Sequence, residues 1–291
     1  MKRVGSILLC VGLMFCASSY AQQNTIHIQG ENTLLVLGQH LNELYQRKQP
    51  NVTIRVHGGG MEPALSLLSK GEIQIAQAHR HVSSEASHGL VAVPVGIEGI
   101  VIYVHESNPV NELSLAQVRS IYLGEVTNWK QVGGRDQRIG LYAGESHTGV
   151  IPYFEEYVLR GSEPFGFWGK NSTKELLDTI AQTPNAMGYS SVGSSPHVKA
   201  LRIKPAADSP AVEPSIANIR SGQYPISRRI YWYLAHKPQG AVKDFCEWVF
   251  SSQGQLVVES IGFQPLTPEE RAASMRNLGI SSSVKQASSG N

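Results

Sequence analysis

Three loops of this chain have the composition expected of an anion-binding site. Residues 30–34, 58–61 and 144–150 are rich in glycine and hydroxyl side chains, and each lies between a strand-like run and a helix-like run. In open α/β sheets, ligands bind at the carboxyl ends of strands, where the unpaired N–H groups of helix N-termini favour anions. A single glycine turn is usually only a turn. The three loops together predict that an anion binds between them.

Histidines near the same loops raise the alternative of a metal site. His57, His79, His81 and His147 all lie close to these loops in the sequence, and imidazole suits zinc and copper. His79 and His81 are the strongest pair, because alternate residues of a strand share a face. Scattered histidines in loops are more often ordinary polar residues. The sequence therefore predicts neither a metal nor a cofactor.

An enzymatic role is a further alternative. Ser146 and His147, with Glu145 beside them, could act as a nucleophile and a base, but neighbours in sequence rarely face each other. The chain contains no G-x-S-x-G turn of the kind that exposes a hydrolase serine. Glu155 and Glu156 are adjacent on a helix-like run and point in different directions, which suits a solvated face. The sequence therefore predicts a protein that is not an enzyme.

Strand-like and helix-like segments alternate along the chain, which favours an α/β architecture. Strands are expected at residues 25–29, 52–56, 73–76, 90–95, 99–105 and 229–234 from their apolar patterns. Helices are expected at residues 34–44, 114–122, 149–159, 241–252 and 268–276, with Ser114 as the N-cap of the second. Residues 281–291 are small and polar, and we expect them to be disordered.

The first 21 residues are typical of a secretory signal peptide. Lys2 and Arg3 precede an apolar run at residues 7–15, and small residues then lead to Ala21. The run is too short for a transmembrane helix, which needs roughly 20 apolar residues. Lipidation at Cys16 is a weaker alternative, because a bulky residue stands directly before that cysteine. We therefore expect cleavage after Ala21 and export of the remaining chain.

Charge and cysteine content exclude several classes of function. Without residues 1–21 the chain has 23 basic and 23 acidic residues, and this balance argues against bulk binding of nucleic acid or anionic lipid. Anion recognition must then be local. Cys246 is the only cysteine left, so stability must come from packing rather than from an internal disulfide. A chain of about 270 residues can bury a sizeable core and often divides into two lobes.

Several stretches of the chain, in order from about residue 25 to residue 266, resemble the phosphate-binding proteins of ABC transporters. IHIQGENT, PNVTIRVHGGG and KGEIQIAQAHR resemble the opening motifs of that family, and ESNPVNELSLAQVRSIYLGEVTNWKQVGG resembles its central stretch. NAMGY, SGQYPISRRIYWY and DFCEWVFSSQGQLVVESIGFQPL resemble its closing motifs. The resemblance implies an α/β, two-lobed periplasmic-binding-protein-like fold of type 2, with the ligand cleft between the lobes.

The resemblance also implies a domain organisation. Lobe one is expected at residues 24–100 plus 224–266 and lobe two at residues 101–223, with a signal peptide at 1–21 and a polar C-terminal tail at 267–291. Two crossings between the lobes would form a hinge, and ligand binding would favour the closed state. Trp129 and Trp248 stand where the family has packing aromatics, so we expect them in the core rather than stacked on a sugar or base.

The resemblance implies a set of ligand residues, although the loops depart from the chemistry of the family. Gly144 stands where the family has an arginine, Val150 and Met61 replace hydroxyl residues, and Glu31 replaces a small residue. Charge-assisted hydrogen bonds are about twice as strong as neutral ones, so these losses predict weaker phosphate binding. Arg80 would remain the principal cation, and protonated histidines could add pH-dependent donors. The predicted ligand residues are Thr33, Leu34 through its N–H, His79, Arg80, His147, Thr148 and Gly149.

We therefore expect a periplasmic, monomeric solute-binding protein that captures phosphate or another small oxyanion for a membrane ABC permease. The alternative is a sensory or interaction component with the same fold, a sensory partner protein and altered or absent anion binding. The loop positions that depart from the family, Glu31, Met61, Gly144 and Val150, favour this alternative. The sequence leaves open the true ligand, the choice between transport and signalling, and any role of the tail.

Overall fold

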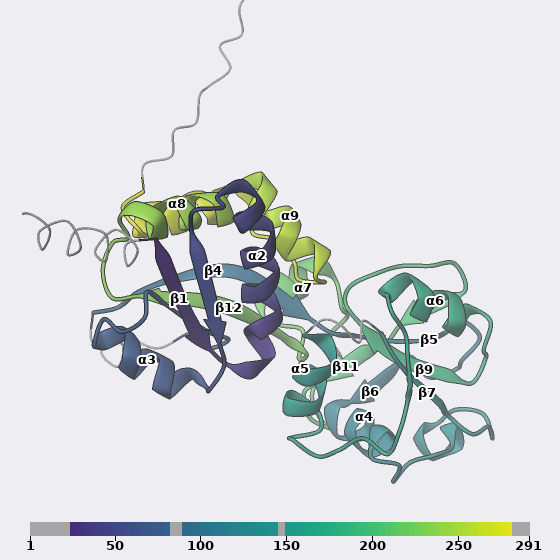
Figure 1. Ribbon diagram of the computed structural model, residues 1–291. Helices are drawn as coiled ribbons and strands as arrows, with labels where there is room; N and C mark the ends of the chain where they lie inside the picture. Colours follow the sequence, from purple (N-terminus) through teal and green to yellow (C-terminus); the bar gives the residue numbers. More distant parts are fainter. Residues whose placement is uncertain (1–23, 82–88, 145–148, 281–291) are drawn as a thin grey trace, which may run out of the picture.

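Two α/β bodies lie side by side in the computed structural model, which describes residues 24–81, 89–144 and 149–280 (Figure 1). The expected signal peptide, His147, Thr148 and the expected disordered end at 281–291 lie outside these described residues. Within the described ranges, no helix is both long enough and apolar enough to cross a membrane. The predicted α/β class is confirmed.

The first lobe is built on a five-stranded sheet with the order β2-β1-β3-β12-β4. β1 (Thr25–Gly30) pairs in parallel with β2 (Thr53–His57) and β3 (Ile75–Ala78). β12 (Ser227–Leu234) runs antiparallel to β3 and to β4 (Val91–Gly99). Because β1, β2 and β3 are parallel, the loops that follow them meet at one edge of the sheet.

Helices cover both faces of this sheet (Figure 1). The 3-10 turn η1 (Asn32–Leu34) leads into α2 (Leu35–Lys48), which shares one apolar core with α8 (Gly240–Val249) and α9 (Ser252–Ser260). α3 (Met61–Ser69) packs in a separate core with β3. α10 (Pro268–Asn277) lies against β4, and Leu278 and Ile280 beyond it are buried. The segment after residue 266 therefore begins by packing on lobe one.

The second lobe has a five-stranded sheet with the order β10-β5-β9-β7-β8. β9 (Ala186–Ser190) lies between β5 (Val101–His105) and β7 (Gly140–Ala143), and β10 (Val198–Ala200) and β8 (Trp168–Gly169) form the edges. β6 (Glu112–Ser114) and β11 (Arg202–Lys204) form a small parallel pair. Its helices are α4 (Leu115–Tyr122), η2 (Trp129–Val132), α5 (Val150–Tyr157) and α6 (Thr173–Ala181).

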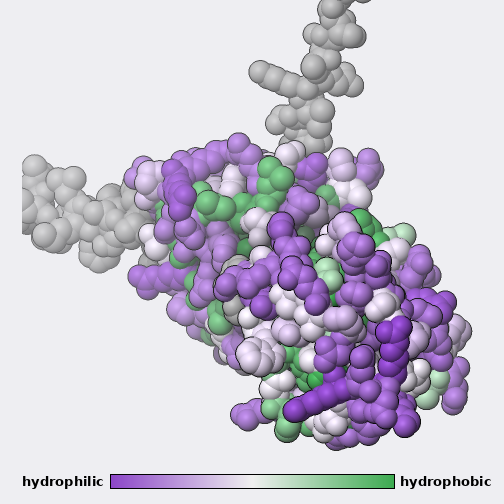
Figure 2. All heavy atoms as spheres, turned by 90° about the vertical axis from the view of Figure 1, so that its right-hand side faces the viewer, coloured by the Kyte–Doolittle hydropathy of each residue, from purple (hydrophilic) through white to green (hydrophobic). Residues whose placement is uncertain are grey.

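Two predicted details of packing are confirmed in these lobes. Ser114 caps α4, accepting a hydrogen bond from the Gln117 N–H. Trp129 and Trp248 are both buried in their lobes. The outer surface of lobe two, seen face on in Figure 2, is mostly hydrophilic with small apolar patches. The apolar side chains of this lobe are gathered mainly in its core.

The chain passes between the lobes at two adjacent points. Ile100 separates β4 from β5, and its N–H donates to the carbonyl of Ile226, just before β12, over 2.9 Å. α7 (Ile216–Ser221) contacts β4 and β12 of the first sheet, although these residues fall in the range expected for lobe two. The exact lobe boundaries stay a prediction, but both crossings lie at one place.

Candidate functional site

The first two predicted loops join each other at the carboxyl edge of the first sheet. The Gly59 N–H donates to Asn32 Oδ1 over 3.1 Å, and the Gly60 N–H donates to the carbonyl of Gly30 over 3.0 Å. Gly59 and Gly60 have φ angles of 116° and 95°, which side-chain-bearing residues rarely adopt. These two N–H groups of the glycine loop therefore hold the first loop in place.

A buried ion pair lies where the two lobes meet. Arg228 of β12 stands opposite Glu98 of β4 in the antiparallel register, close to the crossing points. The Arg228 Nε donates to Glu98 Oε2 over 2.7 Å, and the two side chains are only 7% and 1% exposed. A guanidinium removed from water interacts strongly with charges that come close to it. Arg228 is therefore the dominant buried cation among the described residues of this junction.

Lobe two contributes α5 to the same site. The guanidinium carbon of Arg228 lies 3.7 Å from the centroid of the Tyr153 ring, within the range of a cation–π contact. One turn further along α5, Glu156 Oε2 lies 3.6 Å from Arg228 Nη1. Arg228 thus contacts both lobes at once.

The ends of β1 and β3 add an acid and a histidine. Nδ1 of His79 lies 3.0 Å from Arg228 Nη1 and is also in close contact with the Glu31 carboxylate. Burial, together with the positive charges of Arg228 and Arg80, lowers the pKa of His79 to about 4. His79 is therefore neutral at physiological pH in this structure, and one nitrogen faces both a carboxylate and a guanidinium.

Several buried polar atoms at this junction have no hydrogen-bond partner among the described residues. They are Thr33 Oγ1, Glu98 Oε1, the Tyr153 hydroxyl and Arg228 Nη2. Each buried polar group without a partner costs about 1–3 kcal/mol, so such groups rarely gather without a reason. They come from both lobes: Glu98 and Tyr153 contact Arg228, and the backbone of Thr33 lies near Glu98 at the position of Gly149. We take this junction between the lobes, called the cleft below, as the candidate binding site.

The acidity of Glu98 reflects its burial. Burial raises the pKa of Glu98 to about 7, even though contact with Arg228 favours the charged form, and the nearby Glu156 carboxylate raises it further. Two opposing effects therefore act on one carboxyl group. Near neutral pH the Glu98 carboxyl group can therefore hold or lose its proton. It donates a hydrogen bond in the first state and accepts one in the second.

At Gly149 the start of α5 in lobe two comes close to the first loop of lobe one. It is the N-cap of α5, and a Cβ placed on it would lie 3.0 Å from the Thr33 carbonyl oxygen and 3.4 Å from Glu98 Oε1. Its φ of −73° is one that any residue adopts. The absence of a side chain, rather than backbone freedom, is thus what this position needs.

The structure brings together some of the predicted ligand residues. Thr33, His79 and Gly149 lie at the cleft, as described above. The Leu34 N–H donates to the Glu31 carbonyl over 3.0 Å. The Arg80 side chain is 62% exposed, and its guanidinium pairs with Glu62. His147 and Thr148 lie outside the described residues, so their roles stay predictions, as do the other assignments in this set.

Besides Glu31, which was noted in the sequence only as a departure from the family loop, four residues of the cleft were not among the predicted ligands: Glu98, Tyr153, Glu156 and Arg228. The SGQYPISRRIYWY stretch that contains Arg228 does resemble a family motif, and this was the available signal for that arginine. Glu156, interpreted from the sequence as part of a solvated face, is 51% exposed yet reaches Arg228. Glu98 and Tyr153 belong to an apolar strand and to a helix in the sequence, and nothing in the sequence marked them as ligands.

The arginine position of the family loop is sterically closed in this chain. A Cβ on Gly144 would lie 2.4 Å from Ser190 Oγ, and the same hydroxyl lies 2.8 Å from Thr173 Oγ1. A larger residue at position 144 would displace this hydroxyl pair. Among the described residues, the buried cation of this cleft is Arg228 of β12.

The histidines considered for a metal pair lie in different surroundings. The His79 ring faces Glu31 and Arg228, whereas the His81 ring packs edge-on against Tyr231 at 5.2 Å between centroids. His57, at the end of β2, is exposed. The structure thus does not bring His79 and His81 to a common partner.

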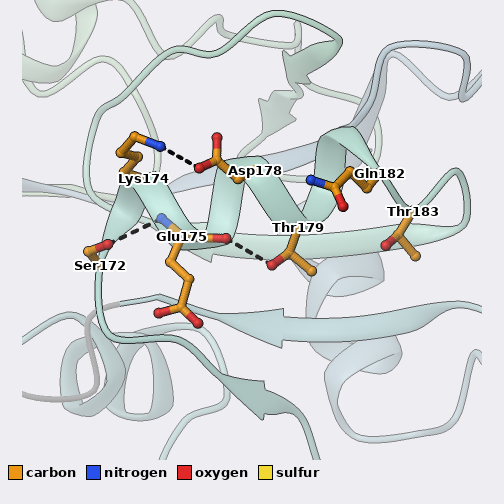
Figure 3. Close-up of a pocket in the computed structure, with 7 residues that line it drawn as sticks. All are labelled: Ser172, Lys174, Glu175, Asp178, Thr179, Gln182 and Thr183. Carbon is orange, nitrogen blue, oxygen red and sulfur yellow. Dashed lines mark hydrogen bonds and ion pairs between the residues drawn. The ribbon is translucent and has the colours of Figure 1, made fainter.

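Surface hollows also occur outside the cleft, and two of them are in lobe two. One, of about 340 Å³, follows the outer face of α6, where Lys174 donates to Asp178 and Thr179 donates to the Glu175 carbonyl (Figure 3). Its polar groups are thus largely satisfied within the helix, as on an ordinary solvated face. The other, of about 490 Å³, is lined by Phe165 and by Trp168 at the edge strand β8.

Two α/β lobes around a cleft that holds a buried cation define a bilobal solute-binding protein. The chain belongs to the PBP superfamily, because the PBP superfamily domain matches residues 17–253. The predicted type 2 fold is confirmed by similarity to the structure of a possible phosphate binding protein from Planctomyces limnophilus. The two share a TM-score of 0.76 and 22% identity, over 88% of this chain and 97% of that one.

Relatives with known names agree with the predicted resemblance, which is confirmed. The phosphate-binding protein PstS of Bacillus subtilis is 29% identical over 251 residues, covering 84% of this chain and 81% of the relative. PstS of Pseudomonas aeruginosa PAO1 is 26% identical over 277 residues, covering 86% of each. An ABC-type phosphate transport receptor from Vibrio cholerae has a TM-score of 0.59 and 27% identity, over 83% of this chain and all of that one. This chain is thus similar to phosphate-binding proteins over most of its length.

Proposed function

We propose that this chain is an extracytoplasmic solute-binding protein that captures phosphate, or a related oxyanion, and delivers it to an ABC transporter. The names of the Bacillus and Pseudomonas relatives and of the Vibrio structure support phosphate as the solute. The expected signal peptide supports a periplasmic location. A receptor of this kind acts alone on its ligand and catalyses no reaction, so we propose a monomer without enzymatic activity and without a resident cofactor.

The observation that carries this proposal is the buried guanidinium of Arg228. Its Nη2 has no partner among the described residues, and the unpaired Thr33 and Tyr153 hydroxyls lie in the same junction. Guanidinium groups bind phosphate oxygens through paired, charge-assisted hydrogen bonds. An anion between the lobes would satisfy donors of both, and it would therefore favour the closed state.

The carboxylates of the cleft favour phosphate over sulfate. Phosphate keeps at least one proton near neutral pH, and Glu98 Oε1 is a buried acceptor without a partner. Sulfate has no proton to donate, so it would face the same carboxylate with repulsion. Sites built to bond a ligand O–H group reject analogues that lack it.

The second candidate function is the sensory or interaction component. Three carboxylates, those of Glu31, Glu98 and Glu156, surround a single described guanidinium. This excess of acid opposes tight binding of a multiply charged anion unless a proton or another cation joins the site. A receptor with weak or absent anion binding would then serve a partner protein instead.

A thermal-shift screen separates the two candidates. Ligand at a hundredfold excess over Kd stabilises a protein by about 2.7 kcal/mol, which corresponds to several degrees for a chain of this size. We expect such a shift with phosphate and a smaller one with sulfate. The absence of a shift with phosphate, sulfate and phosphonates alike would contradict the transport role and favour the sensory one.

A further inference from the structure

We propose that Glu31, His79 and Glu156 form a binding site for a divalent metal ion of the zinc class that bridges the two lobes. Each residue offers one ligand atom, and these atoms lie within 4.8 Å of one another. Glu31 follows β1 and His79 follows β3 in lobe one, whereas Glu156 lies on α5 of lobe two. This site is separate in its chemistry from anion capture, and it does not depend on phosphate being the solute.

The donor set suits a borderline metal. Zinc binds histidine nitrogen and carboxylate oxygen at about 2.0–2.2 Å, so tetrahedral ligand atoms lie roughly 3.3 Å apart. The three ligand atoms lie within 4.8 Å of one another, so side-chain rotations would have to bring them to this spacing. Glu156 is half exposed, and it would leave its contact with Arg228 Nη1 to make this adjustment. Three protein ligands leave a fourth position for water or for an oxygen of another ligand.

The contacts of His79 point to a missing cation. Its Nδ1 is approached by Arg228 Nη1, which can only donate, and by the Glu31 carboxylate, which as an anion can only accept. If Nδ1 carries a proton, it can donate to the carboxylate but cannot accept from the guanidinium. If Nδ1 carries a lone pair, it can accept from the guanidinium but cannot donate to the carboxylate. A metal ion bound to that lone pair would also bind the carboxylate, and the guanidinium would then give up its contact with Nδ1.

The charge of the cluster points the same way. Glu98 already pairs with Arg228 through Nε, and this pair is neutral when both groups are charged. Glu31 and Glu156 then remain as two carboxylates beside His79. One divalent ion compensates both charges at close range.

A buried group without a partner provides independent support. The Arg228 side chain is 7% exposed, and its Nη2 has no partner among the described residues. The Nη1 of the same guanidinium contacts both His79 and Glu156, so Nη2 belongs to a group that borders the cluster. A water or anion on the fourth metal position would accept a hydrogen bond from it.

Calorimetric titration of zinc into the chelator-treated, full-length chain tests this site. The buffer contains no phosphate, so the outcome is independent of solute binding. We expect one zinc per chain, and we expect Glu156→Gln to weaken binding by at least about tenfold, in line with the loss of one ligand. Glu155→Gln, which removes the adjacent carboxylate of the same helix, is the matched control and should stay within about twofold of wild type.

A second variant, measured for both zinc affinity and thermal unfolding, separates the loss of a metal ligand from the loss of the fold. His79→Gln should weaken zinc to the same degree while its thermal unfolding in chelator stays cooperative. Equal affinities of the Glu156 and Glu155 variants, or no zinc uptake by the wild type, would overturn the proposal. Phosphate titrated in chelator reports on the proposed function separately, so a failure of the metal site and a failure of solute binding give different results.

Discussion

At the scale of single residues, burial decides which arginine can act on a ligand. Arg80 and Arg228 both belong to stretches that resemble family motifs, but Arg80 is 62% exposed and pairs with a surface glutamate. Water screens such a pair, and its contribution is typically small. Arg228 is enclosed by Glu98, Tyr153 and His79, where each charge acts in a less polar medium. The cation of the cleft is therefore Arg228.

Burial of Glu98 predicts a pH dependence of stability. Its pKa rises from 4.5 to about 7 on folding, so the folded chain holds this proton where the unfolded chain has lost it. The stabilisation is fully present below pH 4.5 and is lost as the pH rises through about 7. Between these limits the free energy of unfolding should fall by up to about 3 kcal/mol with rising pH.

Denaturant unfolding of the wild type and Glu98→Gln at pH 5 and pH 8, both with chelator, measures this effect. His79, whose pKa is lowered to about 4, acts in the opposite sense below pH 6.5 in both proteins and cancels from the difference. Arg228, Glu156 and Tyr153 also face Glu98 and are present in both. The free energy of unfolding should fall more in the wild type than in Glu98→Gln between pH 5 and pH 8. An equal or smaller fall in the wild type would rule out a raised pKa of Glu98.

At the scale of elements, the start of α5 sets how closely the lobes approach. Gly149 faces the Thr33 carbonyl, which belongs to the backbone of η1 and cannot rotate away. A methyl group there would hold α5 away from the first loop. Because Tyr153 and Glu156 lie further along the same helix, they would move with it.

We therefore expect Gly149→Ala to weaken phosphate binding by roughly tenfold or more, with a loss of stability of only about 1 kcal/mol from the poorer N-cap. Calorimetry and thermal unfolding on the same samples separate the two effects. Gly169→Ala is the matched control, because a Cβ on Gly169 in β8 meets nothing within 4 Å. Unchanged affinity in the Gly149 variant would mean that the lobes do not close at this position.

Local patterns predicted the elements, and long-range register determined the rest of the site. Strand alternation and glycine turns placed the first two loops correctly, because both signals lie within a few residues. The Arg228–Glu98 bond joins residues 130 positions apart, and it depends on the register between β12 and β4. The contact between Arg228 and Tyr153 depends on the approach of a second lobe. Neither arrangement leaves a pattern in a short stretch of sequence.

At the scale of the whole molecule, the two adjacent crossings allow the lobes to move relative to each other. Ile100 and Ile226 are joined by a backbone hydrogen bond at these crossings, and Arg228 lies two residues beyond the second one. Ligand contacts made by both lobes shift such a molecule toward its closed state, to the extent that the ligand prefers that state.

Calorimetric titration of phosphate into the wild type, Arg228→Lys and Arg80→Lys tests the central claim most directly. Lysine keeps the charge at either position but loses the planar fork. We expect one phosphate per chain with a Kd of roughly micromolar or below in the wild type, at least about tenfold weaker binding in Arg228→Lys, and a change within about twofold in Arg80→Lys. Thermal unfolding must remain cooperative in both variants. No heat of phosphate binding in the wild type, or a loss confined to the Arg80 variant, would contradict a phosphate receptor built around Arg228.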